Sequence, residues 1–147
     1  MNTSLIVLVE DDKFQRGDFV SDLKSQLPDA KVEVFSCGVE FLDAYEKRPD
    51  KMPDVFVIDL MLDWRKELVQ TSRPIPNPAP EQRKTAMMCF EAVRNYSTDV
   101  PVILWTMSDL NPPAEAVDSI KTFFRKKDRD IEGDVYNLIR KLLSSRK

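Results

Sequence analysis

The chain has 147 residues, of which 42% are hydrophobic and 32% are charged, and its formal net charge at pH 7 is −3. This is the size of one ordinary domain, which can bury a core without disulfide or metal support. The acidic balance argues against a broad nucleic-acid surface, and the absence of histidine excludes histidine catalysis and histidine metal ligands.

Apolar residues recur with two alternating periods along the chain. Short apolar or alternating runs predict strands, and apolar residues at helical spacing predict helices that end at prolines. The expected order is strand 5–9, helix 14–27, strand 32–35, helix 39–47, strand 55–60, a helix around 86–96, strand 100–106, helix 114–119, strand 122–124 and a final helix around 135–142.

This order predicts an α/β fold. Strict alternation of strands and helices indicates parallel strands joined by right-handed crossovers, with helices on both faces of the sheet. Five such units suit the flavodoxin-like doubly wound order 2-1-3-4-5. We therefore expect one five-stranded domain over residues 1–147.

One stretch breaks the pattern, at about residues 64–82. Prolines at alternate positions from Pro74 to Pro80 cannot continue a helix or a central strand. We expect an extended, partly polyproline-like inserted loop. It is either a tolerated surface insertion or a segment that covers part of the site or shapes partner docking.

Chemistry-bearing residues stand where the strands are expected to end. Ligands of such sheets bind beyond the carboxyl ends of the strands, where the winding reverses, here between the first and third strands. The residues there are Glu10 and Asp11 after the first strand, Asp59 at the end of the third, Thr106 at the end of the fourth and Lys126 after the fifth.

These residue types suit phosphoryl transfer. Three converging carboxylates repel one another unless a cation lies among them, and a set of oxygen ligands suits Mg²⁺. A carboxylate surrounded by a metal, a hydroxyl and a lysine can act as the nucleophile and form an acyl phosphate. Taken singly, each residue has a simpler explanation: Asp12 and its neighbours suit a helix N-terminus, Thr106 an ordinary strand and Lys126 a solvated charge.

Four short motifs in this order resemble the active-site segments of response regulator receiver domains, over nearly the whole chain apart from the proline-rich stretch. They are VEDD at 9–12, VIDLML at 57–62, ILWT at 103–106 and FFRKK at 123–127.

The resemblance implies a role for each residue of the site. Asp59 would be the phosphoacceptor and a metal ligand, Asp11 a direct ligand of Mg²⁺, and Glu10 a ligand mostly through water. The backbone carbonyl of Met61 would complete the protein ligands. Thr106 would bind the phosphoryl group, Lys126 would pair with Asp59 or its phosphate, and Phe123 would be the aromatic switch residue whose burial follows the threonine.

The sequence departs from the receiver pattern at several positions. Receivers usually have a proline after the active-site lysine, where this chain has Lys127, which makes Lys127 an alternative. Lys126 is favoured because it lies three residues after Phe123, as the receiver pattern expects. Asp63 and Trp64 stand where a proline and a glycine usually follow the phosphoacceptor. Met107 stands where a small residue is usual, so it could narrow access to the site.

The expected function is that of a signalling phosphoacceptor that catalyses its own phosphorylation and dephosphorylation. Its partners would be a sensor histidine kinase or a histidine phosphotransfer protein and a downstream effector of unknown kind, with no direct nucleic acid and no membrane. A second copy of the chain, in a homodimer, is a further candidate partner. A degenerate receiver acting as a phosphorylation-independent interaction module is the alternative. A phosphatase of the haloacid dehalogenase type would need a second aspartate at position 61, where this chain has Met61.

The remaining sequence features concern location. The N-terminus has no basic start and only a short apolar run, so it is no signal peptide, and no stretch approaches the roughly 20 apolar residues of a membrane span. Cys37 and Cys89 form no CxxC motif. We therefore expect a cytoplasmic protein. No output domain is visible in this sequence, which leaves open whether it is a stand-alone regulator or a piece of a larger one.

Overall fold

The computed structural model describes residues 3–66, 68–106, 113–117, 119–126 and 134–145. The side chains of Glu115, Val117, Lys126 and Asp134 are outside this description. Met107 and Lys127, two of the positions where the sequence departs from the receiver pattern, lie outside the described residues.

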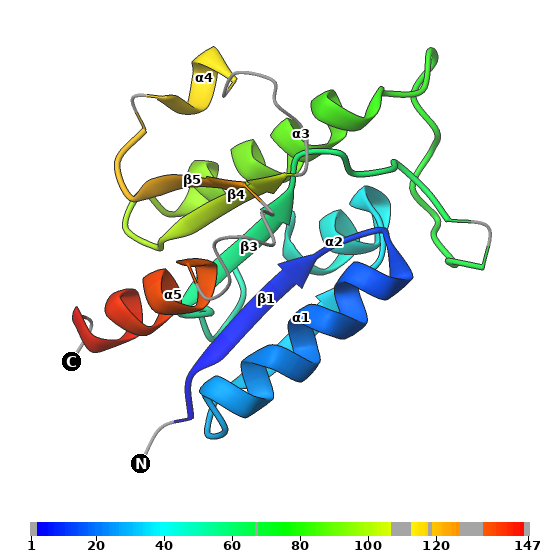
Figure 1. Ribbon diagram of the computed structural model, residues 1–147. Coiled ribbons are helices and arrows are strands. Elements are labelled where there is room, and N and C mark those ends of the chain that lie inside the picture. Colours follow the sequence, from blue (N-terminus) through cyan, green and yellow to red (C-terminus); the bar gives the residue numbers. More distant parts are fainter. Residues whose placement is uncertain (1–2, 67, 107–112, 118, 127–133, 146–147) are drawn as a thin grey trace.

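Strands and helices alternate along the described part of the chain (Figure 1). The strands are β1 (Leu5–Val9), β2 (Lys31–Phe35), β3 (Val55–Asp59), β4 (Val102–Thr106) and β5 (Thr122–Lys126). The helices are α1 (Lys13–Gln26), α2 (Gly38–Tyr45), α3 (Gln82–Tyr96), α4 (Ala114–Val117) and α5 (Asp134–Ser145). Each element that the sequence predicts is present, with shifts of a few residues at the ends.

The strands form one parallel sheet in the order β2-β1-β3-β4-β5, which confirms the predicted topology. The winding reverses between β1 and β3, because the chain first moves from β1 to β2 and then returns past β1. In the register of this pair, Val9 lies opposite Ile58, so both strands end at the same edge of the sheet.

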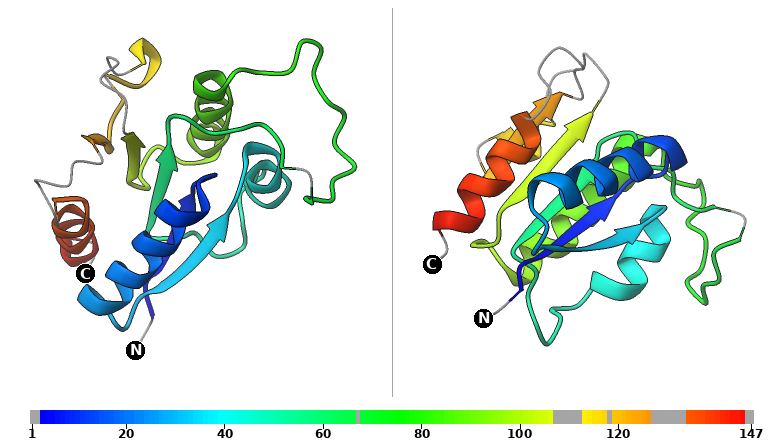
Figure 2. Two further views of the ribbon diagram at one scale, coloured as in Figure 1. Left: turned by 45° about the vertical axis from the view of Figure 1, so that its right-hand side comes forward. Right: turned by 60° about the horizontal axis from the view of Figure 1, so that its bottom comes forward.

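Helices cover both faces of the sheet (Figure 2). Successive side chains of a strand point to opposite faces, so alternate residues join different cores. In β3, Phe56 and Ile58 pack with α2 and α3, whereas Val55 and Val57 pack with α1 and α5. We call these the α2–α3 face and the α1–α5 face. Strands buried on both sides explain the nearly continuous apolar runs of the sequence.

The fifth strand is longer than predicted. The sequence predicts its end at residue 124 with Lys126 beyond it, but Lys126 is the last residue of β5. Neither Arg125 nor Lys126 is a residue type enriched in strands. They extend the strand because Trp105 and Thr106 of β4 lie opposite them and continue the ladder.

Residues 60–81, which we call the β3–α3 connection, contain the proline-rich stretch, and those that are described form no helix or strand. The connection begins inside the protein, where Leu62 and Trp64 pack into the α2–α3 core. Leu68 is exposed, Val69 still packs against the edge of this core, and the connection then runs beside α2 and α3 as a wide loop (Figure 1).

The outer part of this connection is attached to the surface of α2. Arg73 forms an ion pair with Asp43 of α2 at 3.2 Å, and a second with Glu46, the C-cap residue of this helix, at 2.6 Å.

Among the described residues, no helix has the length and apolar character required to cross a membrane.

Candidate metal centre

Three carboxylates meet at the edge of the sheet where β1 and β3 end. One oxygen each from Glu10, Asp11 and Asp59 lies within 4.8 Å of the others. Glu10 is 0% and Asp59 4% exposed, and Asp11 is half-buried. The matched lengths and register of β1 and β3 produce this convergence, because each apolar strand gives way to acidic residues at the same level.

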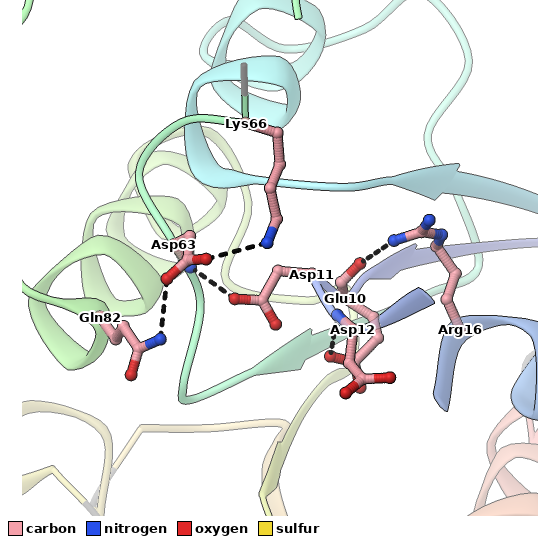
Figure 3. A network of polar contacts seen from close by, with 7 residues as sticks. All are labelled: Glu10, Asp11, Asp12, Arg16, Asp63, Lys66 and Gln82. Atoms are coloured by element: carbon pink, nitrogen blue, oxygen red, sulfur yellow. Dashed lines mark hydrogen bonds and ion pairs between the residues drawn. The ribbon is translucent and has the colours of Figure 1, made fainter. Parts of the chain in front are cut away.

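Backbone N–H groups hold one oxygen of each carboxylate (Figure 3 for Glu10 and Asp11). Met61 donates to Asp59 Oδ1 at 2.9 Å, and Asp63 donates to Asp11 Oδ2 at 2.9 Å. Glu10 Oε2 accepts a longer bond of 3.3 Å from the N–H of Asp12. These bonds fix the directions of the side chains without adding positive charge to the cluster.

The helix that follows β1 stabilises the same corner. Asp12 is the N-cap of α1, since its side chain accepts from the N–H groups of Phe14 and Gln15 at 2.9 and 3.0 Å. Arg16, one turn into the helix, donates to the carbonyl oxygen of Glu10 at 2.9 Å. The capping role considered for Asp12 is confirmed, and it separates this residue from the three clustered carboxylates.

The electrostatics of the cluster favour a cation. Burial raises the pKa of Asp11 above its ordinary value, and the nearby charges of Asp63 and Asp59 raise it further. The N–H of Asp63 and the charge of Lys66 act in the opposite direction. A divalent cation would remove the repulsion, and the oxygen-only donor set fits Mg²⁺ better than a softer metal.

Thr106 and Lys126 end their strands at the same edge. Asp59 lies opposite Trp105 in the β3–β4 register, which places Thr106 one residue further along β4. Thr106 is 7% exposed, and its backbone lies opposite that of Lys126. The side chains of Lys126 and Lys127 are outside the described residues, so the choice between the two lysines stays a prediction.

The two phenylalanines of β5 point to opposite faces of the sheet. Phe123 packs against the core of the α1–α5 face and Phe124 against that of the α2–α3 face. Phe123, the expected switch residue, is half-buried. Its role as a switch residue stays a prediction.

A polar network that the sequence did not predict borders Asp11 (Figure 3). Lys66 Nζ lies 2.9 Å from Asp63 Oδ2, and Gln82 Nε2 donates to Asp63 Oδ1 at 2.8 Å. Burial acts to raise the pKa of Asp63, but the bonds from Gln82 and Lys66 outweigh it and leave this pKa lowered. The ion pair with Asp63 raises the pKa of Lys66. The only signal in the sequence was the acidic residue at position 63, where receivers usually have a proline.

A cleft of about 790 Å³ lies beside the cluster, between the connection, the start of α1 and α2. Asp11 and Lys66 line it, together with Leu68 and Val69 of the connection and both acidic and basic residues of the two helices. Arg73, by contrast, binds α2 and none of the three carboxylates in the contacts described. The connection thus forms a wall on the Asp11 side of the centre.

Sequence comparisons gave no match, since neither a protein-family profile nor a curated protein matches the chain. Solved structures do match. A response regulator receiver protein from Pseudoalteromonas atlantica superimposes with a TM-score of 0.66 at 17% identity, over 97% of this chain and 99% of that one.

Two further neighbours were solved with ligands. The receiver domain of a sensor histidine kinase from Pseudomonas aeruginosa, with a magnesium ion in its active-site cleft, has a TM-score of 0.65 at 14% identity, over 97% of this chain and 99% of that one. A response regulator from Thermotoga maritima in complex with Mg²⁺ and BeF has a TM-score of 0.62 at 16% identity, over 95% and 98%. The chain therefore has the fold of receiver domains.

Proposed function

We propose that this chain is a Mg²⁺-dependent phosphoacceptor, in which Asp59 receives a phosphoryl group from a phosphohistidine of a sensor kinase or histidine phosphotransfer protein. The observation that carries the proposal is the convergence of Glu10, Asp11 and Asp59 within 4.8 Å at the edge where the winding reverses. The magnesium ion in the active-site cleft of the P. aeruginosa neighbour, and the Mg²⁺ and BeF bound to the T. maritima neighbour, support metal binding by a protein with this fold.

Each residue has a definite part in the proposed reaction. A carboxylate oxygen of Asp59 forms the new bond to phosphorus while the bond from phosphorus to the histidine nitrogen breaks, and the imidazole leaves. Bound Mg²⁺ would supply neutralising charge for the phosphoryl oxygens. Glu10, Asp11 and the carbonyl of Met61 would hold the ion, the Thr106 hydroxyl would donate to the phosphoryl group, and the Lys126 ammonium would pair with it.

Phosphorylation would act as a switch by shifting an existing equilibrium between two conformations. Thr106 would follow the phosphoryl group, and the half-buried Phe123 of the neighbouring strand, which lies opposite Ile103 three residues before Thr106, would respond to it. The surface formed by α4, β5 and α5 would then change its affinity for a downstream effector or for a second copy of the chain.

Intact-mass measurement tests the proposal. The protein is incubated with acetyl phosphate and Mg²⁺, and we expect a gain of one phosphoryl group that is lost with a chelator and in Asp59→Asn. Asp54→Asn is the matched control, because Asp54 immediately precedes β3 at the opposite end and accepts a structural bond from Leu5 at 2.8 Å. A folded wild-type protein that gains no mass would contradict the proposal.

One observation favours the alternative of an interaction module that needs no phosphorylation. Asp59 is only 4% exposed, so a donor has little access to it in this conformation. The same measurement separates the two functions, since a module of that kind would gain no phosphoryl group.

A further inference from the structure

We propose that Asp63 is a positioning residue that fixes the Asp11 carboxylate for cation binding and thereby makes the cation affinity depend on the β3–α3 connection. This inference rests on the proposed function, because it requires a divalent cation at the carboxylate cluster. It adds a set of residues, Asp63, Lys66 and Gln82, that the resemblance to receiver domains does not include.

Asp63 is held on every side by groups from different parts of the chain. Its N–H donates to Asp11 Oδ2 at 2.9 Å, and its carbonyl accepts from the N–H of Gly38, at the start of α2, at 2.8 Å. Its two side-chain oxygens accept from Gln82, at the start of α3, and from Lys66. Moving Asp63 would therefore break several hydrogen bonds at once.

Through its hydrogen bond to Asp11, the fixed position of Asp63 determines the orientation of the Asp11 carboxylate in the metal centre. A carboxylate attached to the end of a strand can rotate about its side-chain bonds, and a half-buried one without such a bond would lose ligand geometry. The N–H of Asp63 fixes Oδ2 and so determines where the other oxygen of Asp11 points. A proline at position 63 would have no N–H and could not make this bond.

Substitutions of Lys66 and Gln82 distinguish a positioning role of Asp63 from a purely electrostatic effect on Mg²⁺ binding. Lys66 is a cation close enough to lower the pKa of Asp11, so its charge alone opposes the binding of a second cation. Gln82 is neutral, so its removal changes no charge. If charge alone mattered, Lys66→Met would strengthen Mg²⁺ binding and Gln82→Ala would leave it unchanged. If Asp63 positions Asp11, both variants weaken binding.

The experiment is a titration of the full chain with Mg²⁺, followed by calorimetry or by tryptophan fluorescence, for the wild type, Gln82→Ala and Lys66→Met. The matched control is Gln70→Ala, which removes an exposed glutamine that lines the same cleft but takes part in none of the hydrogen bonds described for Asp11 or Asp63. We expect the dissociation constant for Mg²⁺ to rise about tenfold in Gln82→Ala, which is the lower end of the effect typical for residues that orient a metal ligand. It should also rise in Lys66→Met. Gln70→Ala should match the wild type.

Thermal unfolding without Mg²⁺ shows whether each variant is folded, and if Gln82→Ala does not fold, Lys66→Met decides. Unchanged affinity in a folded Gln82→Ala, tighter binding in Lys66→Met, or an equal loss in Gln70→Ala would overturn the inference while the proposed function stands. A wild-type protein that binds no Mg²⁺ would overturn both, so the two failures are distinguishable.

Discussion

The carboxylate cluster and the outer part of the β3–α3 connection lie close together but are held in different ways. The cluster is buried at the ends of β1 and β3, and backbone N–H groups fix its oxygens. The outer connection is exposed and is attached to α2 through the side chain of Arg73. Backbone bonds inside a fold break only when the fold does, whereas a surface ion pair contributes little.

The two regions meet at Asp63. Residues 60–64 belong to the core and to the centre, since Leu62 and Trp64 are buried and Asp63 binds Asp11. Beyond Lys66, Val69 still packs against the edge of the core, and the residues after it should vary at small cost. Changes near residue 63 should therefore affect stability and metal binding strongly, and changes further along the connection should not.

Two leucines of the connection give the largest predicted contrast. Leu62 is 0% exposed and Leu68 is 93% exposed. Leu62→Ala should lower the free energy of unfolding by about 2–5 kcal/mol, because it leaves a cavity in the core, whereas Leu68→Ala should stay within about 0.5 kcal/mol. Urea denaturation measures both, and equal effects would contradict the division of the connection into a buried and an exposed part.

Two glycines provide a second contrast. A Cβ atom at Gly38 would collide with Cγ2 of the buried Thr85, whereas one at Gly17, in the middle of α1, would meet nothing within 4 Å. Gly38→Ala should destabilise the protein by about 1–3 kcal/mol, and Gly17→Ala should stabilise it by about 0.5–1 kcal/mol. Melting temperatures of both variants give the signs. A stabilising Gly38→Ala would show that α2 and α3 are not in close contact at the start of α2.

Neutralising one carboxylate should relieve the repulsion within the cluster. Without Mg²⁺, we expect Asp59→Asn to raise the free energy of unfolding by about 1 kcal/mol, because it removes one of three charges that lie within 4.8 Å of one another. The wild type should gain stability as Mg²⁺ is added, and the variant much less. Denaturation with a chelator and with Mg²⁺ gives both numbers; a variant that is less stable than the wild type without metal would argue against repulsion.

The smallest effect is expected at the far end of the connection. Arg73→Ala should cost less than about 1 kcal/mol, because its partners are surface carboxylates. The hydrogen bond from Arg73 lowers the pKa of Glu46. The ion pair therefore stabilises the folded protein above the ordinary glutamate pKa and loses this contribution as the pH falls from roughly 4 through the lowered value. A difference between wild type and variant that persists at pH 2 or in high salt would contradict this assignment.

The sequence predicted the fold and the convergence of the carboxylates because both depend on local signals. Apolar runs that stop at Glu10 and Asp59 determine strand ends, and the topology brings those ends together. The role of Asp63 could not be predicted, since its partners Asp11, Gly38 and Gln82 come from three separate parts of the chain. The attachment of Arg73 to α2 could not be predicted either, because no local sequence signal indicates Asp43 and Glu46 as its partners.

Locating the modified residue tests the central claim most directly. Protein phosphorylated with acetyl phosphate and Mg²⁺ is reduced with borohydride, which converts an aspartyl phosphate into a stable homoserine, and is then digested and sequenced by tandem mass spectrometry. We expect the modification at Asp59 and at none of Asp11, Asp12 or Asp63, the other aspartates of this corner. A modification at Asp63 or Asp11, with Asp59 unmodified, would contradict the assignment of Asp59 as the phosphoacceptor.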